Sequence, residues 1–347
     1  MAKMTGTEVC ICTETVSQVI LNGSGENKNR TVFFWDLGVT QKLWTGAKLV
    51  VHTRGGTGRG PGHLIAGGGS PMLNINHKAG EPEAIYISHL FLEQKLFDNK
   101  LTVSAGKLDY GDFFDTNEAA SWNFTSYALA RNPLIPTPWH ALGAVVRYDP
   151  TDWLYVQAGV FDAQASGTET GLNTAFHDED YTVSMYEAGL RHKWGERVGN
   201  YRFILWYDPQ PHSRIDGNGS ERDDLGFALS FDQQVTDKIT AFLRYGWANE
   251  HVRNNRQFWN VGFTWQGPIA ARPADDLGFS VGQTITGHDY RKANGATSSE
   301  TLFETYYRIR FTEWLALSPN VQVMIHPGAS PDNDVAVMAG LRLTVEF

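Results

Sequence analysis

Long hydrophobic runs are missing from this sequence. A helix that crosses a bilayer needs about 20 mostly apolar residues. The longest stretches without a charged side chain, Gly60–His77 and Trp314–Pro331, are interrupted by Gly, Pro, Asn and His, so we predict no transmembrane helix. The start, Met1–Gly6, also lacks the apolar stretch of a signal peptide. Taken literally, this start predicts a cytoplasmic protein. The alternative is a mature chain from which an export signal has been removed.

Cysteine and charge are scarce as well. The cysteines are Cys10 and Cys12, too few for a disulfide framework or a zinc site. Charged residues make up 19% of the chain, against ~25% in ordinary soluble proteins. The formal net charge of −9 argues against a nucleic-acid partner, which would require a basic surface. Aromatic residues nevertheless account for 12% of the chain, which argues against disorder.

Alternation of apolar and polar residues is the dominant pattern, over segments of about ten residues separated by turn residues. At the C-terminus the apolar parity is Val337, Ala339, Leu341, Leu343, Val345 and Phe347, and the other parity is Met338, Gly340, Arg342, Thr344 and Glu346. Elsewhere the polar parity is rich in Gly, Ser, Thr, Asn and Arg, which suits a water-filled interior, and aromatics gather near segment ends, as in membrane barrels. A soluble sandwich would alternate in the same way, so it stays open as an alternative.

The number of alternating segments sets the expected fold. The predicted strands are the ranges 10–20, 31–41, 45–54, 83–94, 100–108, 139–148, 153–161, 183–194, 201–208, 224–232, 238–248, 257–266, 276–286, 302–311, 314–325 and 334–347. We therefore expect an all-β protein, a transmembrane antiparallel β-barrel of about 16 strands. Gly55–Glu81, Gln164–Asp180 and His288–Ser299 are predicted long loops. We assign residues 27–347 to a single outer-membrane barrel domain and residues 1–26 to an N-terminal segment of uncertain origin.

Several stretches follow one another in a recognisable order: Leu92–Leu101, Gly106–Phe114 with Asn123-Phe124 after it, Glu304–Tyr307, Leu315–Gln322 and a last strand closing on Phe347. In this order they resemble the OprB-type carbohydrate-selective porin family. The resemblance implies a sixteen-stranded barrel in the outer membrane of a Gram-negative bacterium, which passes sugars, glucose among them, by diffusion. It implies carbohydrate as the substrate, lipid and lipopolysaccharide as surroundings, and no cofactor. Porins of this size are often homo-trimers, but this family includes apparent monomers, so both states remain open.

Sugar passage needs hydrogen bonds that replace the hydration shell of the sugar and aromatic faces for its C–H groups, in a site that binds weakly enough to release it. The predicted passage-lining residues are Arg54, Lys107, Asp109, Trp122, Arg147, Glu187, Arg191, Arg202, Arg244, Glu304, Arg308, Arg310 and Arg342. Arginine suits this role because its fork of N–H donors stays charged. Each of these residues could instead be a solvated part of the wall. Because the set is mostly basic, we expect a weak anion preference.

The segment Phe113–Pro138 has no clear strand pattern and carries the aromatics Trp122, Phe124 and Tyr127. We expect part of it to fold into the lumen as a constriction loop, with Trp122 as a platform for the sugar. The alternative is an external loop whose aromatic side chains pack on one another.

Other chemistries find little support in the sequence. The spacing of Asp109, Asp112 and Asp115 and the run Asp178–Asp180 offer oxygen ligands for calcium, but neither has an EF-hand pattern. Glu187 and Glu304 could serve as the paired carboxylates of a glycosidase, but nothing in the sequence distinguishes this pair among the 38 acidic residues. No H-E-x-x-H or G-x-S-x-G motif occurs. We therefore predict no catalytic or metal site. The alternatives are a general diffusion porin without sugar preference and, less favoured, an outer-membrane barrel enzyme.

Overall fold

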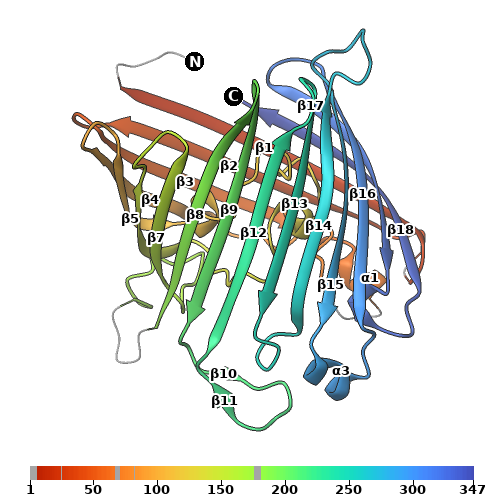
Figure 1. Cartoon of the computed structure of the whole chain (residues 1–347). Coiled ribbons are helices and arrows are strands. Elements are labelled where there is room, and N and C mark those ends of the chain that lie inside the picture. The colour runs from red at the N-terminus through yellow and green to blue at the C-terminus, as the bar shows by residue number, and fades with distance from the viewer. Residues whose placement is uncertain (1–5, 25, 67–70, 82, 176–180) are drawn as a thin grey trace.

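A closed antiparallel barrel of sixteen strands forms the body of the protein (Figure 1). The computed structural model describes residues 6–24, 26–66, 71–81, 83–175 and 181–347. The barrel strands are β1 (Thr7–Asn22), β2 (Asn29–Lys42), β3 (Ala47–Gly58), β4 (Tyr86–Leu96), β5 (Leu101–Leu108), β6 (Ala141–Tyr148), β7 (Leu154–Asp162), β8 (Thr182–Trp194), β9 (Arg197–Asp208), β12 (Asp224–Gln234), β13 (Ile239–Ala248), β14 (Asn255–Gln266), β15 (Asp276–Thr286), β16 (Ser299–Arg310), β17 (Leu315–Ile325) and β18 (Val335–Glu346). Each predicted strand overlaps one of them.

The remaining elements are short and lie in the connections between barrel strands. They are β10 (His212–Ser213), β11 (Ser220–Glu221), α1 (Gly62–Ile65), α2 (Tyr127–Ala130), α3 (His288–Asn294) and the 3-10 turns at Tyr110–Asp112 and Pro327–Ala329. Among the described residues, no helix has the length and apolar character needed to cross a membrane.

The first strand differs from our domain assignment. β1 pairs with β2 on one side and with β18 on the other, and this second pairing closes the barrel. The boundary expected after residue 26 therefore falls in the connection between β1 and β2, and residues 7–22 belong to the barrel. The inward face of β1 mixes Glu14 and Gln18 with Val16 and Ile20, all of them buried. This mixture weakens the alternation from which a barrel strand is recognised.

The two faces of the wall follow the predicted parities. Phe203, Leu205, Leu225, Leu243 and Leu343 are exposed on the outside, where a bilayer would cover them. In contrast, Ser230, Asn260 and Gln322 are buried on the inside. This is the apolar-out, polar-in arrangement of an outer-membrane barrel.

The two ends of the barrel also differ. At one end the strands are joined by short turns, such as residues 43–46 and 149–153, and the exposed tryptophans Trp44, Trp153, Trp194 and Trp314 lie in or beside these turns. At the other end lie the long connections 59–85, 109–140, 163–181, 209–223 and 287–298, with α3 and the β10–β11 hairpin in the lower part of Figure 1. Residues 55–58, expected in a loop, extend β3. In outer-membrane barrels the short turns face the periplasm and the long loops face outward.

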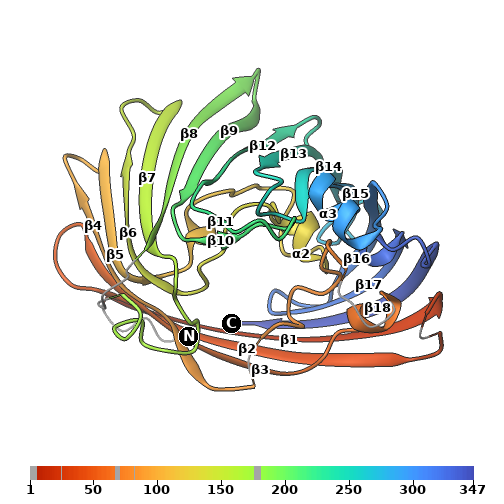
Figure 2. The ribbon, with the colours of Figure 1, turned by 90° about the horizontal axis from the view of Figure 1, so that it is seen from below.

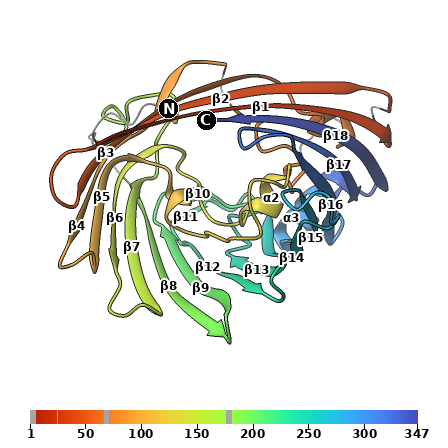
Figure 3. The same cartoon turned by 90° about the horizontal axis from the view of Figure 1, so that it is seen from above.

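The lumen is not empty. Figures 2 and 3 show α2 and the chain around it inside the ring of strands. The connection 59–85 also reaches the inner wall, because Gln322 on β17 donates to the carbonyl of Ile75 at 2.9 Å, and Glu300 on β16 accepts from the backbone N–H of Leu73 at 2.6 Å.

Candidate functional site

Residues 109–140, which join β5 to β6, are called the inserted segment here. It begins with a tight turn, in which Asp109 Oδ1 accepts the backbone N–H of Gly111 at 2.9 Å, and it contains α2 near its middle. It includes Phe113–Pro138, part of which we expected to fold into the lumen. Several of its backbone polar groups are bonded by inward-facing side chains of the wall, because buried backbone groups need partners.

One attachment of the inserted segment is a buried ion pair. Arg244 Nε on β13 donates to Asp115 Oδ1 at 3.0 Å, and both side chains are 1% exposed. The second carboxylate oxygen of Asp115 accepts the backbone N–H of Asn132 at 2.7 Å. The backbone N–H of Asp115 donates in turn to Glu187 on β8 at 3.1 Å. A single residue of the segment is thus tied to two strands, β8 and β13, which are separated by β9 and β12 in the sheet.

A second attachment lies on β16 and β18. Glu304 accepts the backbone N–H groups of Thr125 and Ser126 at 2.5 and 3.0 Å. Arg342 donates to the carbonyl of Trp122 and, at 2.9 Å, to the hydroxyl of Thr125. Charged groups make stronger hydrogen bonds than neutral ones, so these contacts hold the segment firmly.

Several predicted passage-lining residues therefore have another role. Glu187, Arg202, Arg244, Glu304 and Arg342 do face inward, but each is at most 5% exposed. Four of them contact the inserted segment, and the fifth, Arg202, pairs with Asp232 at 2.6 Å, whose carboxylate also accepts the backbone N–H of Glu118 in the segment. They form a covered wall behind the segment rather than the border of an open cavity.

Three further candidates from the sequence have local partners. Lys107 is buried, and its ammonium group donates to the carbonyls of Gly167 and Glu169 in the connection between β7 and β8. Arg308 donates to Asn123 of the inserted segment at 3.1 Å. Arg310 is exposed and pairs with Asp276 at 3.3 Å.

Arg54, Asp109 and Trp122 meet at a cavity of about 340 Å³ between the inserted segment and the wall formed by β1 to β4. We call this cavity the eyelet. Arg54 Nε donates to Asp36 Oδ2 at 3.0 Å, and Arg54 Nη1 donates to His140 Nε2 at 3.3 Å. The carboxylate of Asp36 also lies 2.7 Å from His52 Nδ1. Hydrogen-bonding groups from β2, β3 and the inserted segment therefore converge on one space.

Aromatic rings border the same eyelet. Trp122 is 40% exposed, and its ring centroid lies 5.0 Å from that of His77 and 6.0 Å from that of Tyr127. The guanidinium of Arg131 lies 5.1 Å from the Trp122 ring, and the ammonium of Lys78 lies 3.5 Å from the Phe34 ring. Burial lowers the pKa of His77 to about 4, so this imidazole is neutral at ordinary pH.

The charges of the eyelet differ from the basic lining that we expected. The carboxylates Asp36, Glu81, Asp109, Asp112 and Glu346 border it, and the basic groups are Arg54, Lys78 and Arg131. Of the eight arginines in the predicted set, Arg54 borders the eyelet, whereas Arg202, Arg244 and Arg342 lie in the covered wall and Arg147 and Arg191 border another cavity. The reason for an anion preference is therefore absent at the eyelet.

Arg147 and Arg191 border a second, larger cavity of about 960 Å³ near the short turns. Both donate at 2.9 Å to Asp149, which lies in the turn after β6. Partial burial opposes ionisation of Asp149, but these hydrogen bonds outweigh it and lower the pKa of its carboxyl. The guanidinium of Arg147 also lies 3.8 Å from the Tyr155 ring. This cavity forms an open vestibule between the inserted segment and the short turns.

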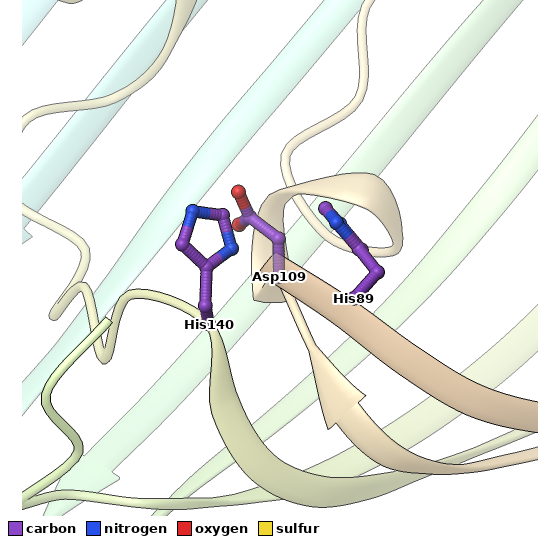
Figure 4. A group of neighbouring side chains, drawn as sticks. All are labelled: His89, Asp109 and His140. Atoms are coloured by element: carbon purple, nitrogen blue, oxygen red, sulfur yellow. The ribbon is translucent and has the colours of Figure 1, made fainter. Parts of the chain in front are cut away.

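A cluster of His89, Asp109 and His140 borders the eyelet (Figure 4). Asp109 was predicted as a site residue but neither histidine was, because the three residues have no motif spacing and meet only where β4, β5 and β6 lie side by side. The calcium ligands considered at Asp109, Asp112 and Asp115 have separate partners, since Asp112 contacts His89 and Asp115 contacts Arg244. The other acidic run, Asp178–Asp180, lies outside the described residues.

A sequence model of the carbohydrate-selective porin, OprB family, matches residues 26–347. The chain belongs to this family. Its members are porins, which are channels of the Gram-negative outer membrane and not enzymes, in agreement with the resemblance found in the sequence.

Individual relatives are distant. Porin AaxA of Chlamydia abortus is 26% identical over 274 residues, which are 74% of this chain and 56% of that protein. Porin B of Pseudomonas aeruginosa is 25% identical over 341 residues, which are 78% of this chain and 74% of that protein. The chain thus spans only about half the length of the Chlamydia relative.

Solved structures agree on the architecture. The high-pH structure of Pseudomonas putida OprB has a TM-score of 0.90 and 21% sequence identity, and the match covers 99% of this chain and 94% of that one. The low-pH structure of the same protein has a TM-score of 0.63 over 99% of this chain. At this level of identity the likeness shows the fold, and the expected sixteen-stranded barrel is confirmed.

Proposed function

We propose that this porin lets small neutral carbohydrates, monosaccharides of the glucose type among them, diffuse passively across the outer membrane through the eyelet. The observation that carries this proposal is the combination, around one cavity, of aromatic faces with charged hydrogen-bonding groups. Trp122, which is 40% exposed, offers its ring, while Arg54 and Asp36 offer donors and acceptors. A pyranose presents the same two kinds of surface, C–H groups on its faces and hydroxyls on its rim.

Passage through the eyelet requires weak and reversible contacts. Arg54 is held by Asp36 and His140, so its remaining N–H donors are fixed in direction and lose little freedom when a hydroxyl arrives. The indole of Trp122 is set by its neighbours His77, Tyr127 and Arg131. A sugar entering the eyelet would exchange water for these groups and then leave into the larger vestibule beside Arg147 and Arg191, down its concentration gradient.

The inserted segment narrows the passage in this proposal. Deleting residues 116–130 should therefore raise the single-channel conductance of the refolded protein in a planar bilayer. An unchanged conductance would show that the segment does not limit the flow. The proposal concerns one barrel and holds for a monomer and for a homo-trimer.

Liposome swelling tests the preference for sugar. Liposomes that contain the refolded protein are placed in glucose, in a disaccharide or in an uncharged amino acid of a size similar to glucose, and their swelling rates are compared. Faster swelling with glucose than with the amino acid supports the proposal, and equal rates would identify a general diffusion porin instead.

Two variants test whether the preference for sugar arises at the eyelet. Trp122→Ala and Arg54→Ala should each reduce the ratio of the glucose rate to the amino-acid rate. The matched controls are Trp247→Ala, an outward tryptophan with a similar exposure of 38%, and Arg310→Ala, an exposed arginine that is also paired with an aspartate. Both controls should leave the ratio unchanged.

A further inference from the structure

The eyelet contains a set of side chains that sugar passage does not require. His89 lies on β4, Asp109 follows the last residue of β5, and His140 precedes the first residue of β6. Each offers one ligand atom, and these three atoms lie within 4.8 Å of one another. Since β4, β5 and β6 are neighbours in the sheet, the fold itself brings the three side chains together. Figure 4 shows the carboxylate of Asp109 between the two imidazoles.

His140 supplies an independent sign that a partner is missing. Its side chain is only 3% exposed, and among the described residues its Nδ1 is buried without a hydrogen-bond partner. Its other ring nitrogen, Nε2, accepts a hydrogen bond from Arg54, so metal binding at Nδ1 moves the imidazole proton from Nδ1 to Nε2 and requires Arg54 to turn away from Nε2. In Figure 4 one nitrogen of this ring points toward the carboxylate of Asp109. Buried polar atoms without a partner are rare in proteins, and this one belongs to a residue type that binds metals.

We propose that His89, Asp109 and His140 bind a divalent transition-metal ion, with zinc or nickel as the typical occupant, and that an ion held there obstructs the eyelet. Two imidazoles and one carboxylate suit these metals, whereas magnesium and calcium prefer oxygen ligands alone. Three protein ligands leave positions open for water on the side of the cavity, as in other accessible zinc sites.

The ligand atoms need little movement to reach an ion. Bonds from zinc to nitrogen or oxygen are about 2.0–2.2 Å, which places two ligands of a tetrahedral ion roughly 3.4 Å apart. The present separations are at most 4.8 Å, so small rotations of the side chains close the site. Ser88 Oγ lies 2.9 Å from His89 Nδ1 and Asp112 Oδ2 lies 2.9 Å from His89 Nε2. An ion bound to one of these nitrogens replaces the contact made there, and the contact at the other nitrogen then orients the ring.

The surrounding charges allow a cation to bind. Arg54 beside His140 opposes it, but the guanidinium of Arg54 is already paired with Asp36 at 3.0 Å. Lys78 and Arg131 are the other basic groups at the eyelet, where carboxylates outnumber basic side chains. A divalent ion would therefore enter a region with an excess of negative charge.

The binding claim is independent of the proposed function, whereas the obstruction rests on it, because obstruction requires that the eyelet be the passage. The test uses refolded, detergent-solubilised protein without a polyhistidine tag, first treated with a chelator. Zinc chloride is titrated in a calorimeter, and the same concentrations are added to single channels in a planar bilayer. We expect saturable zinc binding and a loss of conductance that a chelator reverses.

Variants assign the binding to the cluster. His140→Gln and Asp109→Asn should each weaken zinc binding by about tenfold or more, a loss comparable to that seen when the surroundings of a metal site are altered. The control is His212→Ala, which removes a histidine from a second group of potential ligands, Asp208, His212 and Asp224, on the extracellular side. This variant should still bind zinc at the eyelet and should still lose conductance when zinc is added. An unchanged circular-dichroism spectrum and melting temperature without zinc check that each variant is folded.

The outcomes separate the two claims. Absence of zinc binding, or binding that disappears in His212→Ala and persists in His140→Gln, overturns the proposed site. Binding at the cluster with no change in conductance confirms the site and overturns the obstruction. Failure of the sugar preference in metal-free swelling overturns the proposed function alone, since the calorimetric titration does not depend on transport.

Discussion

On β9, β13 and β18 the inward arginines Arg202, Arg244 and Arg342 are buried behind the inserted segment, whereas Arg54 on β3 and Arg147 on β6 border open cavities. All five occupy equivalent inward positions of one barrel and follow the same alternation. The difference comes from the residues 109–140, which cover one side of the lumen and leave the other free. An inward position alone therefore does not decide whether an arginine binds the inserted segment or borders an open cavity. That depends on whether the inserted segment covers the arginine.

The largest effect is expected at the centre of the covered wall. Arg244→Met leaves the carboxylate of Asp115 buried without its charge partner, and removing one partner of a buried pair costs about 3–5 kcal/mol. The melting temperature in detergent should fall, and the single-channel conductance should rise as the inserted segment loosens. An unaltered melting temperature would mean that Asp115 is not held by this contact.

An effect of comparable size is expected at Glu304. In Glu304→Ala the backbone N–H groups of Thr125 and Ser126 lose a charged acceptor, and a hydrogen bond to a charged group is worth about 1.5–3 kcal/mol. Melting should again occur at a lower temperature. Glu304→Gln, which keeps one acceptor oxygen, should fall between the wild type and the alanine variant. Equal stability of both variants would contradict a role for the carboxylate charge.

At the open side we expect selectivity to change and stability to stay nearly constant. Because carboxylates predominate at the eyelet, the pore should favour cations weakly, opposite to the expectation from the sequence. Asp109→Asn should shift the reversal potential toward anions. The permeability ratio should change by about fivefold, since a unit charge 4 Å away in water contributes about 1 kcal/mol. Anion selectivity of the unmodified protein would refute this prediction.

The smallest effect is expected at Arg310, which pairs with Asp276 at the exposed end of the barrel. Exposed ion pairs contribute about 0–1 kcal/mol. Arg310→Met should therefore melt within a few degrees of the wild type and conduct normally. A conductance increase like that of Arg244→Met would remove the distinction between the covered wall and the exposed end.

The strands were predictable because alternation is a local property. In Val335–Glu346 successive side chains face lipid and the lumen in turn, so the pattern is visible in a short stretch of sequence. β1 was placed correctly as a strand but set apart from the barrel in the domain assignment. Its pairing with β18 joins residues more than 300 positions apart, as in the contact of Cys12 with Glu346, and local pattern carries no information on such a partner.

The sixteen strands, their inward and outward faces and the family of the chain could be predicted from the amino-acid sequence, because each of them depends on short-range pattern or on ordered local motifs. The three-dimensional fold was needed to see that Arg244 and Glu304 hold the inserted segment, that Arg54 and Trp122 share the eyelet, and that His89 and His140 meet Asp109. Burial and electrostatic partners depend on which residues cover a side chain. In this barrel the covering segment and the covered wall are brought together only when the sheet closes.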